Sequence, residues 1–504
     1  MSEPAKTELA HGQMKDVLDP DCIPMKPEEE RRMLRKMDLH IYPIVLSLFI
    51  MQFLDKVNIG NARLFGLERD LGLHGNDYQL CVALLFVTYI PFEFPTPLIL
   101  KQVRPNRLIP TIAVCWGLAS ICTGFVQNKG QLIATRMLIG LFEAGYFPAV
   151  SFYLTFFYRR RELGMRLFLV FASSAVAGAC GGLVAYGVGY MNGMRNMSAW
   201  RWLMILEGIP TVLLGFCAYF VLANDPLEAT FLTEREKYLV RVRRDLDLPS
   251  SPSSSPSPGP KDEKEKEKKE EKIEWDQIFS AWKDWKVWTM TLAQIGVNTM
   301  IYGYVTFIPT IIHAMGYSDL HAQLLTIPCY AVGALSYLAV AYLSDRSGYR
   351  GYFVLGGCVV ACTGYAILLG TPRYGPHAQY AGCLVVAAGV YVASGLPLSW
   401  LLNNLPSDYK RAAGQGTCIA LGNCAGIISS FIYRTQDKPT YYLGHGLTLG
   451  FVFVSGCLYA LTTFLLRREN KRRDRGERDY LLEGKTPEEI EKLGEYHPEY
   501  RYLY

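Results

Sequence analysis

The stretch PSSPSSSPSPGPKDEKEKEKKEEK, residues 249–272, divides this sequence into two halves. A Ser/Pro run followed by mixed Lys and Glu buries too little apolar surface to fold, so we expect a disordered linker. Six apolar blocks lie on each side, and each is about 20 residues or longer, enough to cross a bilayer core of ~30 Å as a helix. The twelve blocks are residues 40–60, 77–100, 107–127, 131–157, 165–190, 201–223, 287–313, 321–343, 351–370, 377–403, 412–433 and 443–466.

The composition agrees with a helical membrane protein. Half of the 504 residues are hydrophobic, and the blocks lack the period-2 alternation of a membrane β-barrel. Of the 13 cysteines, only Cys22 lies in a clearly polar segment, and none forms a CxxC pair. HExxH, GxSxG and a His pair at metal-binding spacing are also missing from the sequence. We therefore predict an all-α polytopic membrane protein of two six-helix bundles that is not an enzyme and has no cofactor or metal.

Basic clusters predict the orientation. RRMLRKMD (31–38) precedes the first block and RRENKRRDRGER (467–478) follows the last, which places both termini in the cytoplasm. An even number of spans satisfies this arrangement. The tryptophan-rich IEWDQIFSAWKDWKVW (273–288) favours a helix at the membrane surface. The predicted parts are an N-terminal tail (1–38), a first bundle (39–223), a cytoplasmic linker with the interfacial helix (224–286), a second bundle (287–466) and a C-terminal tail (467–504).

One inner loop carries a motif. LSDRSGYR (343–350) resembles the D-R-x-G-[RK] signature of the major facilitator superfamily, in which the residues matching Asp345 and Arg346 help to lock the cytoplasmic gate. The corresponding loop of the first half, LKQVRPNR (100–107), lacks the pattern. The alternative interpretation is an ordinary basic loop that contains glycine. The 6 + 6 arrangement around a long inner linker is also that of this superfamily.

Ionisable residues inside the blocks are functional hypotheses by default, because a buried charge in a bilayer costs a few kcal/mol or more. Acidic and basic residues at central positions occur only in the first half: Asp55, Lys56, Glu93, Arg136, Glu143 and Glu207. Arg136 and Glu143 are seven residues apart, which places them on one helix face roughly 10 Å apart. The structural alternatives are a local Asp55–Lys56 pair, an Arg136–Glu143 strut and, for Glu207, pairing with a neighbouring helix, which we favour.

Three segments resemble a narrower family. FLDKVNIGNA (53–62), RMLIGLFEAGYFP (136–148) and WRWLMILEG (200–208) are similar to the anion:cation symporter family, above all to its fungal allantoate permease-like branch. The likeness extends over about residues 38–466. Members of that family move small organic anions such as allantoate, nicotinate, pantothenate and biotin, usually together with protons.

The resemblance also implies roles for four residues. Lys56 and Arg136 would bind the anion, and Asp55 and Glu143 would carry the coupled protons. Relatives commonly have Arg at the position of Lys56, and lysine offers a point charge instead of a bidentate fork. This departure weakens the assignment of Lys56 as an anion-binding residue.

Polar positions of the second half predict neutral recognition of the substrate. Gln294, Asn298 and Tyr302 are spaced four apart and share a helix stripe. The tenth block adds Asn403 beside Trp400 and Asn404, and the eleventh adds Asn423. The alternative interpretation is that these amides only tie neighbouring helices together, as single buried amides often do.

Two further positions have alternative roles. Glu93, between Pro91 and Pro95, either belongs to the inner gate or bonds backbone groups that the prolines leave free. Asn196 begins the sequon NMS in a short outer loop and is a candidate glycosylation site.

The sequence predicts a secondary transporter that acts as a monomer by alternating access, and the resemblance implies that it lies in a fungal membrane, for which we expect the plasma membrane. Its partners would be a small organic anion, protons and the bilayer, with no nucleic acid. Ionised Asp55 and Glu143 would compete with the anion for the two cations, so that proton and anion favour each other. The alternatives are an exporter of a metabolite or toxin on the same fold, and a membrane sensor that does not transport.

Overall fold

The computed structural model describes residues 27–93, 96, 99, 103–247, 275–405, 408–486 and 494–504. Helices make up nearly all of its regular structure, and the described ranges contain no β-strand. The Ser/Pro and Lys/Glu stretch (249–272) lies outside the described residues, so its predicted disorder stays a prediction.

Each predicted span of the first half corresponds to a helix. The helices are α2 (Pro27–Leu64), α4 (Asp77–Glu93), α6 (Pro105–Thr123), α7 (Lys129–Glu143), α8 (Tyr146–Phe157), α9 (Arg160–Gly189) and α10 (Ala199–Val221), with the short α3 (Leu67–Asp70) and η2 (Met194–Asn196) between them. The block predicted at 131–157 is divided into α7 and α8, with Ala144 and Gly145 between them. The start of α7 is capped by Asn128, whose side chain accepts a 2.9 Å hydrogen bond from the Gln131 N–H.

The second half repeats the pattern. Its helices are α14 (Trp285–Ala314), α15 (Asp319–Ser347), α16 (Arg350–Gly370), α17 (Pro376–Asn403), α18 (Asp408–Asn423), α19 (Ala425–Ile432) and α20 (Tyr442–Asp474). In the described part of the chain, ten helical segments are long and apolar enough to cross a membrane. The other two predicted spans correspond to α4 and α6, which have 17 and 19 residues. The fold is therefore the predicted all-α, multi-span membrane architecture.

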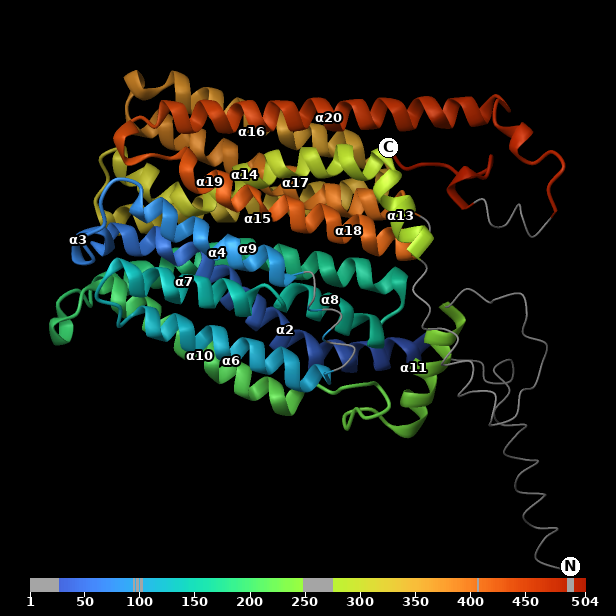
Figure 1. Cartoon of the computed structure of the whole chain (residues 1–504), viewed down its shortest axis with the longest axis horizontal. Coiled ribbons are helices and arrows are strands. Elements are labelled where there is room, and N and C mark those ends of the chain that lie inside the picture. Colours follow the sequence, from blue (N-terminus) through green and yellow to red (C-terminus); the bar gives the residue numbers. More distant parts are fainter. Residues whose placement is uncertain are drawn as a thin grey trace, which may run out of the picture.

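Two more helices mark one end of the bundle. Figure 1 shows α11 (Glu234–Asp247) and α13 (Trp275–Lys283) at the end where α2 begins and α20 finishes. We call this the linker end and the opposite one the far end. Lys36 of α2 pairs with Glu236 of α11 at 2.8 Å. The Trp282 indole N–H donates to Thr417 Oγ1 at 3.0 Å and holds α13 against α18.

The two halves lie side by side as the blue-to-green and the yellow-to-red bundles of Figure 1, and glycines allow them to touch. A Cβ on Gly60 would clash with the Thr306 carbonyl, one on Gly182 with Thr326, and one on Gly426 with Phe86. Because lipid supplies little hydrophobic drive between helices, such close backbone approach is a main source of helix association.

Candidate functional site

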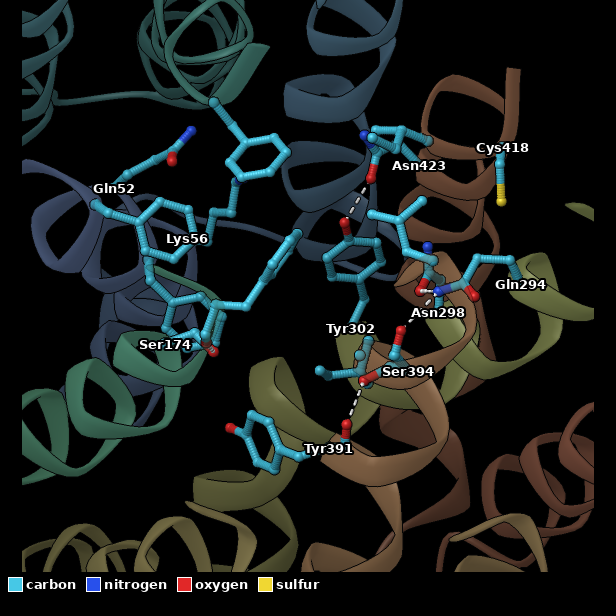
Figure 2. A pocket seen from close by; sticks show the side chains of 18 of the residues that line it. Gln52, Lys56, Ser174, Gln294, Asn298, Tyr302, Tyr391, Ser394, Cys418 and Asn423 are labelled. Carbon is cyan, nitrogen blue, oxygen red and sulfur yellow. Dashed lines mark hydrogen bonds between the residues drawn. The ribbon is translucent and has the colours of Figure 1, made fainter. Parts of the chain in front are cut away.

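A central cavity of about 180 Å³ lies between the halves. Figure 2 shows its polar groups on two sides, with Gln52, Lys56 and Ser174 of the first half facing Gln294, Asn298, Tyr302 and Asn423 of the second. On α2 the lining residues run from Phe49 to Lys56, and Gly60 follows them toward the far end. On α9 the lining residue Ser174 is followed in the same direction by Gly182. The glycine contacts therefore close the cavity toward the far end.

Lys56 supplies a cation to the cavity wall. Its Nζ lies 3.0 Å from Oε1 of Glu143, whose side chain is fully buried. The same ammonium lies 4.4 Å from the centre of the Tyr89 ring, a cation–π distance. Gln52 donates to the main-chain oxygen of Glu143 at 3.1 Å and joins α2 to the end of α7. The cavity cation is thus neutralised by an acid that does not itself line the cavity.

Arg136 lies outside the central cavity. It lines a smaller cavity of about 40 Å³, whose wall also contains Lys56, Phe53 and Tyr302. The guanidinium is 1% exposed and approaches Met204 Sδ at 3.9 Å. Within the described ranges its Nε has no hydrogen-bond partner. A buried guanidinium with an unused donor is a candidate for binding an anion.

Two more acids lie inside the first half. Asp55 accepts a 2.8 Å hydrogen bond from Ser120, while its other carboxyl oxygen has no described partner. Asp55 is close enough to Arg136, Glu143 and Glu207 to interact with them electrostatically. No described group forms a hydrogen bond with the Glu207 carboxyl, so the predicted helix-pairing contact of Glu207 is not found there.

Three of the predicted amides of the second half, Gln294, Asn298 and Asn423, line the cavity. Gln294 donates to Asn298 at 2.8 Å and to the main-chain oxygen of Ser394 at 3.1 Å. Tyr302 donates to Asn423 at 2.6 Å, and Asn423 donates to Glu93 at 2.7 Å. The Asn423–Glu93 bond connects the two halves beside the cavity.

Four predicted residues lie elsewhere. Asn403 is exposed at the linker end, and its main-chain oxygen accepts a bond from the Tyr500 hydroxyl at 3.3 Å. Asp345 pairs at 2.6 Å with Arg350 of its own half, and Arg346 is exposed. Asn196 is exposed at the far end. The structure therefore does not bring Asn403 to the predicted substrate site.

Sequence reasoning missed most of the aromatic wall. Eight aromatic side chains line the cavity: Phe49, Phe53, Tyr89, Phe147, Phe171, Tyr302, Tyr337 and Tyr391. A signal was available on α2, because Phe49, Phe53 and Lys56 are spaced four and three apart and share one helix face.

The helical halves and the polar cavity between them define a membrane transporter. Residues 44–433 match the Major Facilitator Superfamily, and the chain belongs to that superfamily of secondary transporters. It is 36% identical over 450 residues to an uncharacterized transporter of Schizosaccharomyces pombe, covering 89% of this chain and 86% of that protein. It is 33% identical over 509 residues to the high-affinity nicotinic acid transporter of Saccharomyces cerevisiae, covering 100% of this chain and 91% of that protein.

A solved structure shares the fold. The bacterial homolog of the human lysosomal transporter Spinster, in an inward-facing and unoccupied conformation, superposes with a TM-score of 0.62 at 14% identity. The match covers 87% of this chain and 98% of that one.

Proposed function

We propose that the protein takes up a small organic anion together with protons, as a member of the anion:cation symporter family and its fungal allantoate permease-like branch. The observation that carries the proposal is the 3.0 Å pair between Lys56 in the cavity wall and the buried Glu143 behind it. A substrate carboxylate needs the same ammonium that Glu143 occupies.

This competition provides the coupling. Protonation of Glu143 releases Lys56 for the anion, and a bound anion in turn favours the protonated acid, because linkage between two ligands is reciprocal. Asp55 and Arg136 form a second acid–cation set on the far-end side. We expect Arg136 to meet the anion when the far end opens, because its small cavity shares Lys56 and Tyr302 with the central one.

The cavity wall favours a flat monocarboxylate. Lys56 and Glu93 are the charged side chains in the described part of the wall, and aromatic rings surround them. Rings pack against a planar substrate at little entropic cost, while Asn298 and Asn423 offer neutral hydrogen bonds. Nicotinate fits this pattern better than the ureido acid allantoate, and a relative is named as a nicotinic acid transporter. Vitamin acids with a long flexible chain fit this pattern less well than either nicotinate or allantoate.

The remaining assignments are part of the same proposal. The basic clusters place the linker end and both termini in the cytoplasm of a fungal cell, with the protein a monomer in the plasma membrane. Asp345, Arg346 and Glu93 belong to the gates of the transport cycle, and Asn196 is a glycosylation acceptor.

The test is uptake of a panel of labelled carboxylates into cells that express the protein. Uptake is measured at acidic and at slightly alkaline external pH, with and without a protonophore, for wild type, E143Q and E207Q. We expect acid-stimulated, protonophore-sensitive accumulation of nicotinate. E143Q should exchange internal for external nicotinate but not accumulate it, because exchange needs no net proton movement. E207Q is the matched control, a buried acid of the same half with no described ion pair. Absence of accumulation at either pH, with efflux from preloaded cells, would identify an exporter instead.

A further inference from the structure

The last residues of the chain return to the linker end of the second half. Figure 1 shows the C-terminus beside α13 and α14, although α20 extends well past them. Residues 494–504, which are called the tail from here on, contact α14, α17, α18 and α20 there. Glu495 is only 5% exposed, which is unusual for a carboxylate. A loose tail would not bury a charge.

A buried charge cluster holds Glu495. Its two oxygens lie 2.8 Å from Lys286 Nζ and 2.5 Å from Lys410 Nζ. Asp284 pairs with the same two lysines, at 3.2 Å and 2.6 Å. Two carboxylates thus balance two ammonium groups. Without Glu495 the cluster would keep one buried cation in excess, which is strongly unfavourable.

Two asparagines bind the main chain of the tail. The Asn404 amide donates to the Leu503 oxygen at 2.9 Å and accepts from the Leu503 N–H at 2.9 Å. The Asn470 amide makes the same two bonds with Tyr502, at 2.8 Å and 3.0 Å. Each amide therefore satisfies a donor and an acceptor of the backbone, as a neighbouring β-strand does.

Two larger side chains complete the site. The Trp400 indole donates to the Leu503 oxygen at 2.7 Å, and Arg473 donates to the Tyr500 oxygen at 2.8 Å. Arg473 also lies over the Tyr502 ring at 4.7 Å. The tail is thus bound through its backbone, one carboxylate and an aromatic ring, which are the features of a peptide-binding site.

The helices that bind the tail also line the central cavity. Trp400 lies two residues beyond the lining residue Leu398 on α17. Lys286 and Lys410 each precede a lining residue by about two helical turns, Gln294 on α14 and Cys418 on α18. The tail therefore connects the linker-end tips of three cavity helices.

We propose that the linker end of the second half is a peptide-binding site whose ligand is the chain's own segment 494–504, and that the bound segment fixes the spacing of α14, α17 and α18 around the cavity. This proposal does not depend on the identity of the transported anion. A second copy of the chain would offer the same peptide only in trans, whereas the tail is already connected to α20 and has a high effective concentration.

Hydrogen exchange on the full-length protein in lipid nanodiscs tests the site. Wild type should protect the N–H groups of Tyr502 and Leu503, which bond to Asn470 and Asn404. E495Q and the double variant N404A/N470A should each exchange these amides at least about tenfold faster, with the transmembrane helices unchanged. E499Q is the matched control, because Glu499 is an exposed carboxylate of the same segment. Exchange of the wild-type tail at the rate of an unstructured peptide would overturn the proposal.

Alkylation of Cys418 tests the effect on the cavity helices. Cys418 lines the cavity and is 2% exposed. Peptide mapping after treatment with a thiol reagent should show faster modification of Cys418 in E495Q than in wild type or E499Q. If E495Q releases the tail and the rate at Cys418 stays that of E499Q, the fixed spacing is refuted although the peptide site stands. Neither readout uses a transported anion, so both remain informative if uptake is never observed.

Discussion

Lys56 Nζ and Glu143 Oε1 lie 3.0 Å apart, with the lysine in the cavity wall and the acid buried behind it. An anion that enters the cavity therefore meets a cation that already has a counter-ion. Removing one member of a buried pair is costly, because the other member stays unpaired. Under the proposed function, we expect anion binding to be favourable only when the acid is neutral, so that this single contact would couple binding to protonation.

The first prediction concerns the pH dependence of anion binding. In wild type, affinity for nicotinate should rise on acidification as Glu143 takes up a proton and leaves Lys56. In E143Q the affinity should be high and nearly independent of pH. K56M should bind at least about tenfold more weakly than wild type at acidic pH, where Lys56 is free for the anion, since loss of a buried charge contact costs about 2 kcal/mol or more. Binding measured over a pH series on purified protein checks this. An unchanged pH profile in E143Q contradicts the proposed coupling.

The second prediction concerns the bond between the halves. Asn423 accepts from Tyr302 and donates to Glu93, so N423A removes a cross-half contact to a charged group, worth about 1.5–3 kcal/mol. The structure that contains this bond is closed at the far end, so loss of the bond should shift the population toward the state in which the halves separate there. Spin labels on the exposed far-end positions Asn76 and Arg373 should show the longer of two distances gaining population about tenfold or more. S399A is the control, because Ser399 bonds only within its own helix. Equal distance distributions in N423A and S399A would refute a gating role for this bond.

Much of the fold could be predicted because few backbone arrangements are stable in a lipid bilayer. In a bilayer the backbone N–H and C=O groups of a chain must form hydrogen bonds with one another, because no water is present. An apolar block of about 20 residues therefore becomes a helix whatever its detailed sequence. Each of the twelve predicted blocks corresponds to helical structure. The breaks at Ala144–Gly145 and at Cys424 were missed, because hydropathy does not change at either position.

The site was predicted only in part, because the type of a residue does not show how far along the bundle its side chain lies. Gln294, Asn298, Tyr302 and Asn423 line the cavity, whereas Asn403, an equally polar residue of the tenth block, lies at the linker end. The partner of Glu143 proved to be Lys56 of α2, although Arg136 shares its own helix face. Such pairings depend on how helices are rotated against one another, which a single sequence leaves open. The contacts of Glu495 join residues 85 and 209 positions apart and follow from no local pattern.

The third prediction concerns close packing of the halves. A Cβ on Gly182 would meet Thr326 and the Gln323 carbonyl of the opposite half. G182A should therefore destabilise the far-end-closed state by about 1–3 kcal/mol, the usual cost of overpacking, and shift the spin-label distances toward separation. Gly187 lies on the same helix with nothing within 4 Å of an added Cβ, so G187A is a matched control. A similar response of both variants would show that the effect comes from the helix itself and not from the contact.

The fourth prediction concerns stability at low pH. Burial opposes ionisation of the Asp284 carboxyl, but the ammonium groups of Lys286 and Lys410 outweigh it and hold the pKa of Asp284 below its ordinary value. A carboxyl whose pKa is lower in the folded protein stabilises it fully above the unfolded pKa of about 3.9, and this stabilisation is lost as pH falls from there through the folded pKa. D284N should therefore be less stable than wild type near neutral pH by about 3 kcal/mol, the cost of unbalancing a buried charge cluster.

The expected pH dependence defines both the control variant and the result that would contradict this prediction. The difference in unfolding temperature between wild type and D284N, followed by fluorescence in nanodiscs, should be largest near neutral pH and shrink below about pH 4. Asp276 is an exposed carboxylate of α13, so D276N should match wild type throughout. A D284N deficit that stays constant down to strongly acidic pH would contradict the charge-based account, because asparagine keeps an N-cap oxygen that can accept from the Lys286 N–H, as Asp284 does at 2.9 Å, and loses only the charge.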